Sequence, residues 1–490
     1  MIKVNSATLI GLEAIAVQIE VDIRSGLPCF EMVGLAGMAV RESRERVRAA
    51  IKNSGFLFPM QRITVNLAPA GIKKNGSLFD LPIAVGILAA MGEFSQEMLS
   101  NFFMAGELSL GGDTRAITGS LSLAELASSQ QKSLLISAEN ANEAAAVARG
   151  VYPIRSLQQA QNFLQGKVQI TPVTPKTYQP IAQNPSFAYI HGQDIAKRML
   201  QIAAFGRHHS LIMGPPGSGK TLLAQVLPDL LSPLSHRQAI EVTKIYSAAG
   251  LLPPKSELVQ TRPHRRPHHT ISVPGLVGGG QRINPGEISL AHEGVLLLDE
   301  LLEFSPHAIQ ALREPLEKGS ISLTRANQWI SFPANFLLVA TTNPCPCGYL
   351  GDFDHECRCN HNQIITYQKK MTGPLLDRID LFTFLHPLKS SDYQDDRKEQ
   401  NRWNGLISYP PAKSNPNGRL TNKQVQQIPI TIEAQTFLRK ANDRLKLSAR
   451  GHYKTLKVAK TIADLDQSKT IQLMHIAEAL QYRWEALNIF

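Results

Sequence analysis

Residues 211–221 read Leu211-Ile-Met-Gly-Pro-Pro-Gly-Ser-Gly-Lys-Thr221, and this stretch decides the fold. A short apolar run leads into a glycine-rich loop and an apolar helix over residues 222–227, which together fit the Walker A pattern. We expect backbone N–H groups and the helix N-terminus to converge on phosphate oxygens, Lys220 to reach the β- and γ-phosphates of ATP, and Thr221 to bind Mg²⁺. An ordinary Gly-Pro turn is the alternative, but the flanking strand and helix favour a phosphate site. The predicted loop comprises Gly214, Pro215, Pro216, Gly217, Ser218, Gly219, Lys220 and Thr221.

Two further strands are predicted to deliver polar residues to the same edge of a sheet. In Val295-Leu-Leu-Leu-Asp-Glu300 the apolar residues indicate a buried parallel strand, and its carboxyl end is where open α/β sheets bind ligands. We expect Asp299 to hold Mg²⁺ and Glu300 to orient the attacking water. Another strand, over residues 336–342, ends in Asn343, which is placed to sense the γ-phosphate.

Length and charge limit the class of protein. At 490 residues the chain is too long for one hydrophobic core, so two or three domains are expected. The net charge of +11 favours an anionic partner beyond ATP, with nucleic acid first and a membrane surface second. Glu13 and Glu20 interrupt the apolar residues near the amino terminus, which argues against a secretory signal, and no later apolar run is long enough to span a bilayer. We therefore expect a soluble, cytoplasmic protein.

Residues 1–165 alternate β-like stretches (15–23, 63–67) with helical ones (43–54, 81–91), which predicts an α+β or α/β domain without a phosphate loop. Its segments 71–84 and 106–110 resemble the Lon-protease-like fold that is related to ribosomal protein S5 domain 2. In that family a catalytic serine lies two residues after the glycine matched here by Gly76. Leu78 takes that position, and no lysine lies around residues 118–121, so we expect a binding or assembly platform. Ser77 as a displaced nucleophile is the alternative.

The rest of the chain divides by composition. A Pro-, Thr- and Gln-rich stretch predicts a linker at 166–188, an α/β ATPase core covers 189–388, and a polar connector of unassigned role covers 389–428. Apolar periodicity predicts a helical lid at 429–490, with helices over 432–445, 448–465 and 470–487. Arg450 opens the middle helix, from which it can reach back to the γ-phosphate.

Residues 255–287 form a predicted basic insertion in the core. Between Glu257 and Glu287 there is no carboxylate, whereas Arg262, Arg265, Arg266 and Arg282 occur with several histidines and a run of glycines. We expect this insertion to be exposed and to contact DNA through Arg265 and Arg266. A solvated basic loop is the alternative, and a metal held by His268 and His269 is a weaker one.

Residues 319–332 alternate like a hairpin, with Arg325 near the tip. If such a tip faces the pore of a ring, its arginine can grip a phosphate backbone.

The loop 345–359 carries two Cys-x-Cys pairs, whereas Cys29 stands alone. In a reducing compartment such a cluster favours a metal over disulfides, and tetrahedral Zn²⁺ is the natural occupant of four thiolates. Reduced, unligated cysteines and a redox role are the alternatives, because the one-residue spacing is tighter than usual. The predicted ligands are Cys345, Cys347, Cys357 and Cys359.

Several longer strings together resemble the AAA+ class and, more closely, the magnesium-chelatase-like ComM/YifB family. These strings are Arg266-Pro-His-His-Thr270, Leu276-Val-Gly-Gly-Gly280, Pro285-Gly-Glu-Ile-Ser-Leu-Ala-His-Glu-Gly294, Leu312-Arg-Glu-Pro-Leu316, Asn343-Pro-Cys-Pro-Cys-Gly348 and Gly373-Pro-Leu-Leu-Asp-Arg-Ile-Asp-Leu381. The resemblance covers nearly the whole chain. It implies a Lon-like amino-terminal domain, an AAA+ core with insertions, a helical lid and a hexameric ring.

The resemblance also implies roles for single residues. Asn343 is similar to sensor 1, Arg378 to the arginine finger given to a neighbouring subunit, and Arg450 to sensor 2. The lid departs from the family at Lys454, where we expect arginine, because lysine keeps the charge but not the bidentate geometry.

Members of the ComM type resemble branch-migration helicases that pair incoming single-stranded DNA with the chromosome during natural transformation. The sequence therefore predicts a Mg²⁺-dependent ATPase that moves along single-stranded or branched DNA, with recombination proteins as further partners. The alternative is a chelatase-like remodelling ATPase that acts on a protein or a metal-insertion partner. Protease activity is not expected.

Overall fold

The computed structural model describes residues 1–35, 37–74, 76–181, 190–253, 255–280, 283–325, 328–352, 354–370, 373–388 and 416–486. Residues 182–188 of the predicted linker and residues 389–415 of the predicted connector lie outside the described residues. The chain forms two compact units: Met1–Gln179 with His236–Val259, and Pro180–Ser235 with Gln260–Phe490. Among the described residues, no helix combines the length and apolarity needed to cross a bilayer.

The described part of the first unit is built on a seven-stranded mixed sheet in the order β3-β4-β2-β1-β5-β8-β9. The strands β1, β2 and β4 pair antiparallel and the remaining neighbours pair parallel. The strands are β1 (Ile2–Ile10), β2 (Glu13–Arg24), β3 (Cys29–Val33), β4 (Arg62–Ala68), β5 (Phe102–Ala105), β8 (Ser133–Ser137) and β9 (Val151–Ile154), with a small ribbon of β6 (Glu107–Leu108) and β7 (Thr114–Arg115). The helices are α1 (Met38–Asn53), α2 (Asp80–Ala90), α3 (Gln96–Ser100), α4 (Ser120–Ser129), α5 (Ala141–Ala145), α6 (Leu157–Leu164) and α9 (His236–Ala248).

The helix α2 is the centre of this unit's core, because it is apolar on all sides and its residues 80–89 are buried. Asp80 at its start is buried too, and its charge is matched by Arg46, whose Nε lies 2.7 Å from Oδ2. The strands and helices predicted at 15–23, 63–67, 43–54 and 81–91 are confirmed as β2, β4, α1 and α2.

The helix α9 packs with the first unit, although it follows the phosphate loop in the chain. Lys244 donates to Glu125 at 2.8 Å and to Glu13 at 3.2 Å, and the backbone N–H of Gly119 donates to the Ser247 hydroxyl at 3.0 Å. Residues 236–259, which sequence analysis places within the core 189–388, therefore belong to a different compact unit.

Within its described residues the second unit contains a five-stranded, all-parallel sheet in the order β11-β14-β17-β10-β18. The strands are β10 (Ser210–Met213), β11 (His264–Arg265), β14 (Val295–Leu298), β17 (Leu337–Thr342) and β18 (Leu381–Phe384). β10, β14 and β17 are buried along their whole length, as their apolar runs predict. Because all five run in the same direction, their carboxyl ends share one edge, and the predicted mixed α/β fold with a parallel sheet is confirmed.

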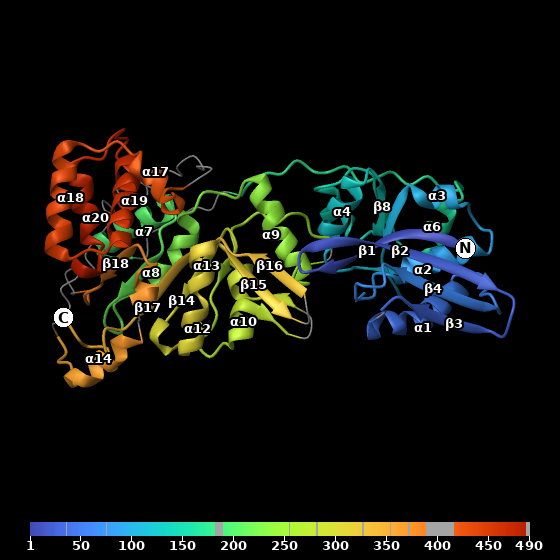
Figure 1. The fold of residues 1–490 in the computed structure, drawn as a ribbon, viewed down its shortest axis with the longest axis horizontal. Helices are drawn as coiled ribbons and strands as arrows, with labels where there is room; N and C mark the ends of the chain where they lie inside the picture. The colour runs from blue at the N-terminus through green and yellow to red at the C-terminus, as the bar shows by residue number, and fades with distance from the viewer. Residues whose placement is uncertain are drawn as a thin grey trace. The chain divides into compact units, whose positions relative to one another are not determined.

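Helices cover this sheet, and the chain ends in a helical lid, which is red in Figure 1. The helices outside the lid are α7 (Asp194–Gly206), α8 (Lys220–Val226), α10 (Val273–Val277), α11 (Glu287–Leu290), α12 (Pro306–Ala311), α13 (Arg313–Lys318), α14 (His361–Lys369), α15 (Gly373–Leu376) and α17 (Asn422–Gln426). Two antiparallel pairs are β12 (Gly278–Gly279) with β13 (Asn284–Pro285), and β15 (Ser320–Arg325) with β16 (Gln328–Pro333).

The lid consists of α18 (Ile432–Leu445), α19 (Ala449–Leu465) and α20 (Leu473–Gln481), as predicted for the first two helices. The third was predicted to run to residue 487, which is wrong: α20 ends at Gln481, and a 3₁₀ turn at Trp484–Ala486 follows. Tyr482 is nearly fully buried there, and its carbonyl accepts a hydrogen bond from the N–H of Phe382 in β18. The helix thus ends just before the residue whose backbone carbonyl bonds to the sheet.

Candidate nucleotide-binding site

The phosphate loop and the strand end after β14 meet directly. The hydroxyl of Thr221 donates to the carboxylate of Asp299, with Oγ1 3.0 Å from Oδ1 and 3.2 Å from Oδ2. Thr341, near the end of β17, donates to Oδ1 of the same carboxylate at 2.5 Å. The two residues predicted to hold Mg²⁺ are thus brought together, and they offer oxygen atoms of the kind that Mg²⁺ prefers.

Lys220 curls over the loop that precedes it. Its Nζ donates to the carbonyl oxygens of Gly214 and Pro215, each at 2.8 Å. Burial lowers the pKa of Lys220 to about 8, against the opposing effect of the nearby Asp299 and Glu300 carboxylates. In a loop of the Walker A pattern, this ammonium is the group expected to bind phosphate.

The loop needs its glycines. Gly217 and Gly219 have φ values of 78° and 84°, in the left-handed region that other residues enter only at a cost, and Gly219 caps the N-terminus of α8. A Cβ at either position would meet nothing within 4 Å, so the requirement is conformational.

Asp299 is held in its charged form. Burial raises the pKa of Asp299, but hydrogen bonds from Thr341, Thr221 and Arg266 outweigh burial and lower the pKa below its ordinary value. A carboxylate that stays ionised is what a cation site requires.

Glu300 adopts a strained backbone conformation, with φ 53° and ψ 54°, which is uncommon outside glycine. Its N–H donates to the Thr341 hydroxyl at 3.1 Å, and its side chain is 56% exposed. The exposed carboxylate is open to water, which suits a group that orients water. Asn343 lies directly after β17, as predicted.

Arg266, assigned to DNA by sequence reasoning, lies at this site. Its Nη2 is 2.6 Å from Oδ2 of Asp299, and His269 Nδ1 is 4.0 Å from Oε2 of Glu300. Sequence reasoning missed this placement because β11 is only two residues long. The sequence offers no local signal for this placement, because so short a strand leaves no apolar run that could be recognised.

The other described arginines of the predicted basic insertion are paired as well. Arg265 forms a bidentate pair with Glu287, both N–O distances being 2.6 Å. Arg262 is only 8% exposed and bonds the carbonyl of Glu293. The expectation that the whole insertion is exposed is therefore wrong at Arg262, whose guanidinium is used inside the unit; Arg282 lies outside the described residues.

Arg378 and Arg450 meet at a third residue. Arg378 Nη2 bonds Oε2 of Glu317, and Arg450 Nη2 lies 3.1 Å from Oε1 of the same carboxylate. All three line a cavity of about 560 Å³, together with Lys454 and Lys457. The structure thus groups Arg378 with Arg450, and Lys220 with Thr221 and Asp299.

The hairpin β15–β16 confirms the predicted alternation. Arg325 pairs with Gln328 as the last rung before the tip. One face is buried through Ile330 and Phe332, whereas Trp329, on the other face, is 69% exposed. A large aromatic side chain on the solvent face beside the tip was not singled out from the sequence, although its position in the alternating pattern shows it.

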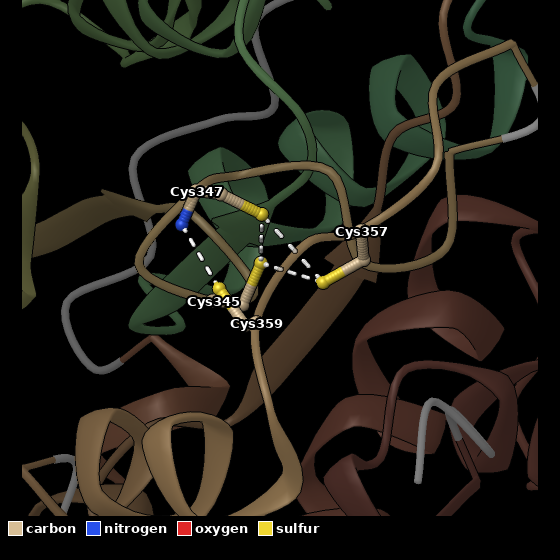
Figure 2. Close-up of side chains that lie close together, drawn as sticks. All are labelled: Cys345, Cys347, Cys357 and Cys359. Carbon is tan, nitrogen blue, oxygen red and sulfur yellow. Dashed lines mark hydrogen bonds between the residues drawn. The ribbon is translucent and has the colours of Figure 1, made fainter.

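The four clustered cysteines lie close together after β17, and Figure 2 shows their sulfur atoms directed toward one another. The Sγ atom of Cys345 is 3.4 Å from that of Cys347 and 3.7 Å from that of Cys357, Cys347 and Cys357 are 3.6 Å apart, and the Cys347 N–H donates to Cys359 Sγ at 3.4 Å. These sulfurs are too far apart for disulfides. A tetrahedral zinc site with Zn–S bonds of about 2.3 Å has sulfurs about 3.8 Å apart.

The cysteine loop also packs on the phosphate loop. A Cβ added at Gly348 would lie 2.7 Å from Cδ of Pro216. The metal-type cluster and the nucleotide-type site are therefore neighbours within one unit.

The amino-acid sequence matches family models along most of its length. The family described as "Magnesium chelatase, subunit ChlI" matches residues 186–393, "Subunit ChlI of Mg-chelatase" matches residues 19–140, and "Magnesium chelatase, subunit ChlI C-terminal" matches residues 390–483.

Curated relatives match over nearly full length. The chain is 40% identical over 501 residues to "Competence protein ComM" of Haemophilus influenzae, covering 98% of this chain and 97% of the relative. It is 37% identical to "Uncharacterized protein YifB" of Escherichia coli, covering 98% and 96%. A more distant similarity, 24% identity over 306 residues, relates 62% of this chain to 32% of "DNA helicase MCM8" of Xenopus tropicalis.

Proposed function

Because the chain belongs to the ComM/YifB family of magnesium-chelatase-like AAA+ proteins, we propose that it is an ATP-driven DNA motor, a branch-migration helicase that promotes integration of single-stranded DNA during natural transformation. Its substrate is single-stranded or branched DNA in the cytoplasm, its working form is a hexameric ring, and recombination proteins are its further partners. The names of two relatives, a competence protein and a DNA helicase, support this proposal.

ATP hydrolysis is the chemical part of the proposal. Thr221 and Asp299 hold Mg²⁺, Lys220 binds phosphate, Glu300 orients water and Asn343 senses the γ-phosphate. Mg²⁺ held by Thr221 and Asp299 would neutralise charge on the phosphates. The contact between Thr221 and Asp299 supports this reading, because it joins the two ligand residues at the end of a buried strand.

DNA binding is the part that the hairpin carries. Trp329, next to the last pair before the hairpin tip, offers an exposed flat surface for a base, and Arg325, in that last pair, is a residue type that binds phosphate. Such pairs of groups suit single strands, because every base has a face to stack. Arg265 and Arg266 remain predicted DNA contacts, but their pairing with carboxylates makes the hairpin the stronger candidate.

ATP hydrolysis measured with and without single-stranded DNA tests this function. We expect DNA to stimulate hydrolysis, with stimulation that falls steeply as salt rises. Trp329→Ala and Arg325→Ala should each lose most of the stimulation and keep the turnover seen without DNA. Ser331→Ala, on the same exposed strand face but farther from the tip, is the matched control.

A chelatase-like remodelling ATPase is the second candidate. It is favoured by the three magnesium-chelatase family models, which match residues 19–140, 186–393 and 390–483. It predicts hydrolysis that a partner protein stimulates and DNA does not. Absence of DNA stimulation at both low and high salt would leave this candidate in place of the helicase.

Zinc is the proposed occupant of the four-cysteine cluster. The sulfur–sulfur distances of 3.4, 3.6 and 3.7 Å among Cys345, Cys347 and Cys357 support it, since they are close to those of a tetrahedral thiolate site. Elemental analysis of the purified protein should find about one zinc per chain. Cys357→Ser should lose it, and Cys29→Ser, which alters an exposed cysteine elsewhere, should keep it.

The first unit is proposed to have the Lon-like fold and to serve as a platform rather than a peptidase. Leu78, at the position of the family's serine, is buried. The Ser77 hydroxyl donates a hydrogen bond to the carboxylate of Glu107, and Lys74 is buried with its ammonium bonded to the carbonyl of Gly34. These contacts supply no serine–lysine pair for acyl transfer.

A further inference from the structure

Arg266 lies at the proposed Mg²⁺ site. It directly follows β11, which pairs in parallel with β14, so both strands end at the same sheet edge. From there its guanidinium reaches Oδ2 of Asp299, at 2.6 Å. The same carboxylate is the proposed metal ligand.

The Asp299 carboxylate has little room for a second cation. Oδ1 accepts hydrogen bonds from Thr221 and Thr341, and Oδ2 accepts from Arg266 and, at 3.2 Å, from Thr221. A guanidinium and a metal ion directed at one carboxylate repel each other strongly in a partly buried site. Binding of one therefore weakens binding of the other.

The two arginines at the end of β11 differ in their freedom to move. Arg265 is fixed by two bonds to Glu287 and is 30% exposed. The side chain of Arg266 is 43% exposed and bonds the carboxylate through one nitrogen. Arg266 can thus swing into solvent without breaking the strand.

We propose that Arg266 is a positioning residue of the ATP site that competes with Mg²⁺ for Asp299, so that binding of the metal–nucleotide complex releases Arg266 and the segment that follows it. His269 extends the same segment to Glu300, 4.0 Å away, so release changes the surroundings of both strand-end carboxylates. The proposal rests on the proposed ATP site and adds a residue to it.

Competition at Asp299 has a reciprocal consequence. Any anion that draws Arg266 away from Asp299 strengthens Mg²⁺-nucleotide binding by the same factor by which the nucleotide strengthens binding of that anion. The phosphate backbone of DNA would be such an anion, since Arg266 is itself a predicted DNA contact. One arginine thereby links DNA occupancy to nucleotide affinity.

The test measures binding rather than turnover. The dissociation constant of a fluorescent, non-hydrolysable ATP analogue is determined for the full chain over a series of Mg²⁺ concentrations and in EDTA. Arg266→Ala should lower the Mg²⁺ concentration at half-saturation by roughly threefold to tenfold, because a charged hydrogen bond to the ligand carboxylate is gone. Affinity in EDTA should change by less than about twofold.

Arg265→Ala is the matched control, since it removes the same charge from the adjacent residue and should leave the Mg²⁺ dependence unchanged. Arg266→Lys, which keeps the charge and loses the planar fork, should give an intermediate value and guards against misfolding of the alanine variant. An unchanged or raised half-saturation in Arg266→Ala would overturn the proposal, as would a large loss of affinity in EDTA, which would make Arg266 a phosphate ligand. If the wild type shows no Mg²⁺-dependent nucleotide binding, the proposed ATPase fails instead.

Discussion

Arg378 and Arg450 bind opposite oxygens of a single carboxylate, that of Glu317. Arg378 follows the short helix α15, and Arg450 lies in the first turn of the lid helix α19. The resemblance predicts that Arg378 is the arginine given to a neighbouring subunit. Since Arg450 lies on the same carboxylate, we infer that it serves the neighbour's ATP site as well, rather than its own.

A subunit-mixing experiment tests that inference. Arg378→Ala and Arg450→Ala should each lower ATP hydrolysis, by about 10³-fold or more for the finger residue. Mixing Arg450→Ala subunits with Lys220→Ala subunits should restore activity, because a Lys220→Ala subunit still offers its arginine to the intact phosphate loop of its neighbour. In randomly mixed rings roughly a quarter of the interfaces are of this type. Mixtures that stay inactive would place Arg450 at its own subunit's site.

Nucleotide affinity should depend on pH through Lys220. Phosphate binds the charged ammonium, and burial lowers the pKa of Lys220 to about 8. Affinity should therefore stay constant below pH 8 and fall as the pH rises above it, by up to about tenfold per unit. Titration of a non-hydrolysable ATP analogue from about pH 7 upward measures this. Lys220→Arg, whose charge persists, should give a flat curve, and a flat curve for the wild type would contradict the lowered pKa.

The contact between the cysteine loop and the phosphate loop should affect the affinity for ATP. Gly348→Ala places a Cβ 2.7 Å from Pro216 Cδ, so the phosphate loop must shift and nucleotide affinity should fall while zinc is retained. Gly351→Ala is the matched control: it has a similar positive φ, 79° against 89°, but its Cβ would face Phe384. Both should lose about 1–2 kcal/mol of stability. Equal nucleotide affinities in the two variants would show that the loops are not coupled.

Lys454 should matter for folding. Its Nζ lies 2.9 Å from Oδ1 of Asp380, and burial lowers the pKa of Lys454 against the opposing effect of that carboxylate. Lys454→Ala leaves Asp380 buried without this partner and should cost about 3–5 kcal/mol in urea unfolding. Lys457→Ala removes a bond from Nζ to the carbonyl of Gly418 and a charge that acts on Asp380 without an ion pair, and should cost about 1 kcal/mol. Similar losses in both variants would contradict a charge-specific role.

The phosphate loop and the strands β14 and β17 could be predicted from sequence, because glycine spacing and runs of apolar residues are local signals. The first two lid helices were likewise predictable from their period. The family was predicted from the resemblance of several longer sequence strings, and nearly full-length relatives confirm it.

The contacts of Arg266 and Arg450 could not be predicted, because each depends on a carboxylate far away in the chain. The charge pattern of residues 255–287 indicated a free basic loop, since sequence alone does not show that Glu287, Glu293 and Asp299 lie beside it in the fold. Trp329 is a different case, because the sequence did offer a signal: Trp329 alternates with Ile330 and so shares a face with the polar Ser331.

The place of α9 decides how this protein can be dissected. Because residues 236–259 pack with the first unit, the chain passes between the units at three points, after residues 179, 235 and 259. A cut in the predicted linker 166–188 would leave two covalent connections intact. A fragment that starts after that cut would carry α9 without Glu13, Glu125 and Gly119, and so with Lys244 and Ser247 deprived of their bonds. If such an ATPase fragment is insoluble, the cause would be a domain boundary that separates α9 from the rest of its unit, and not a need for the first unit in catalysis.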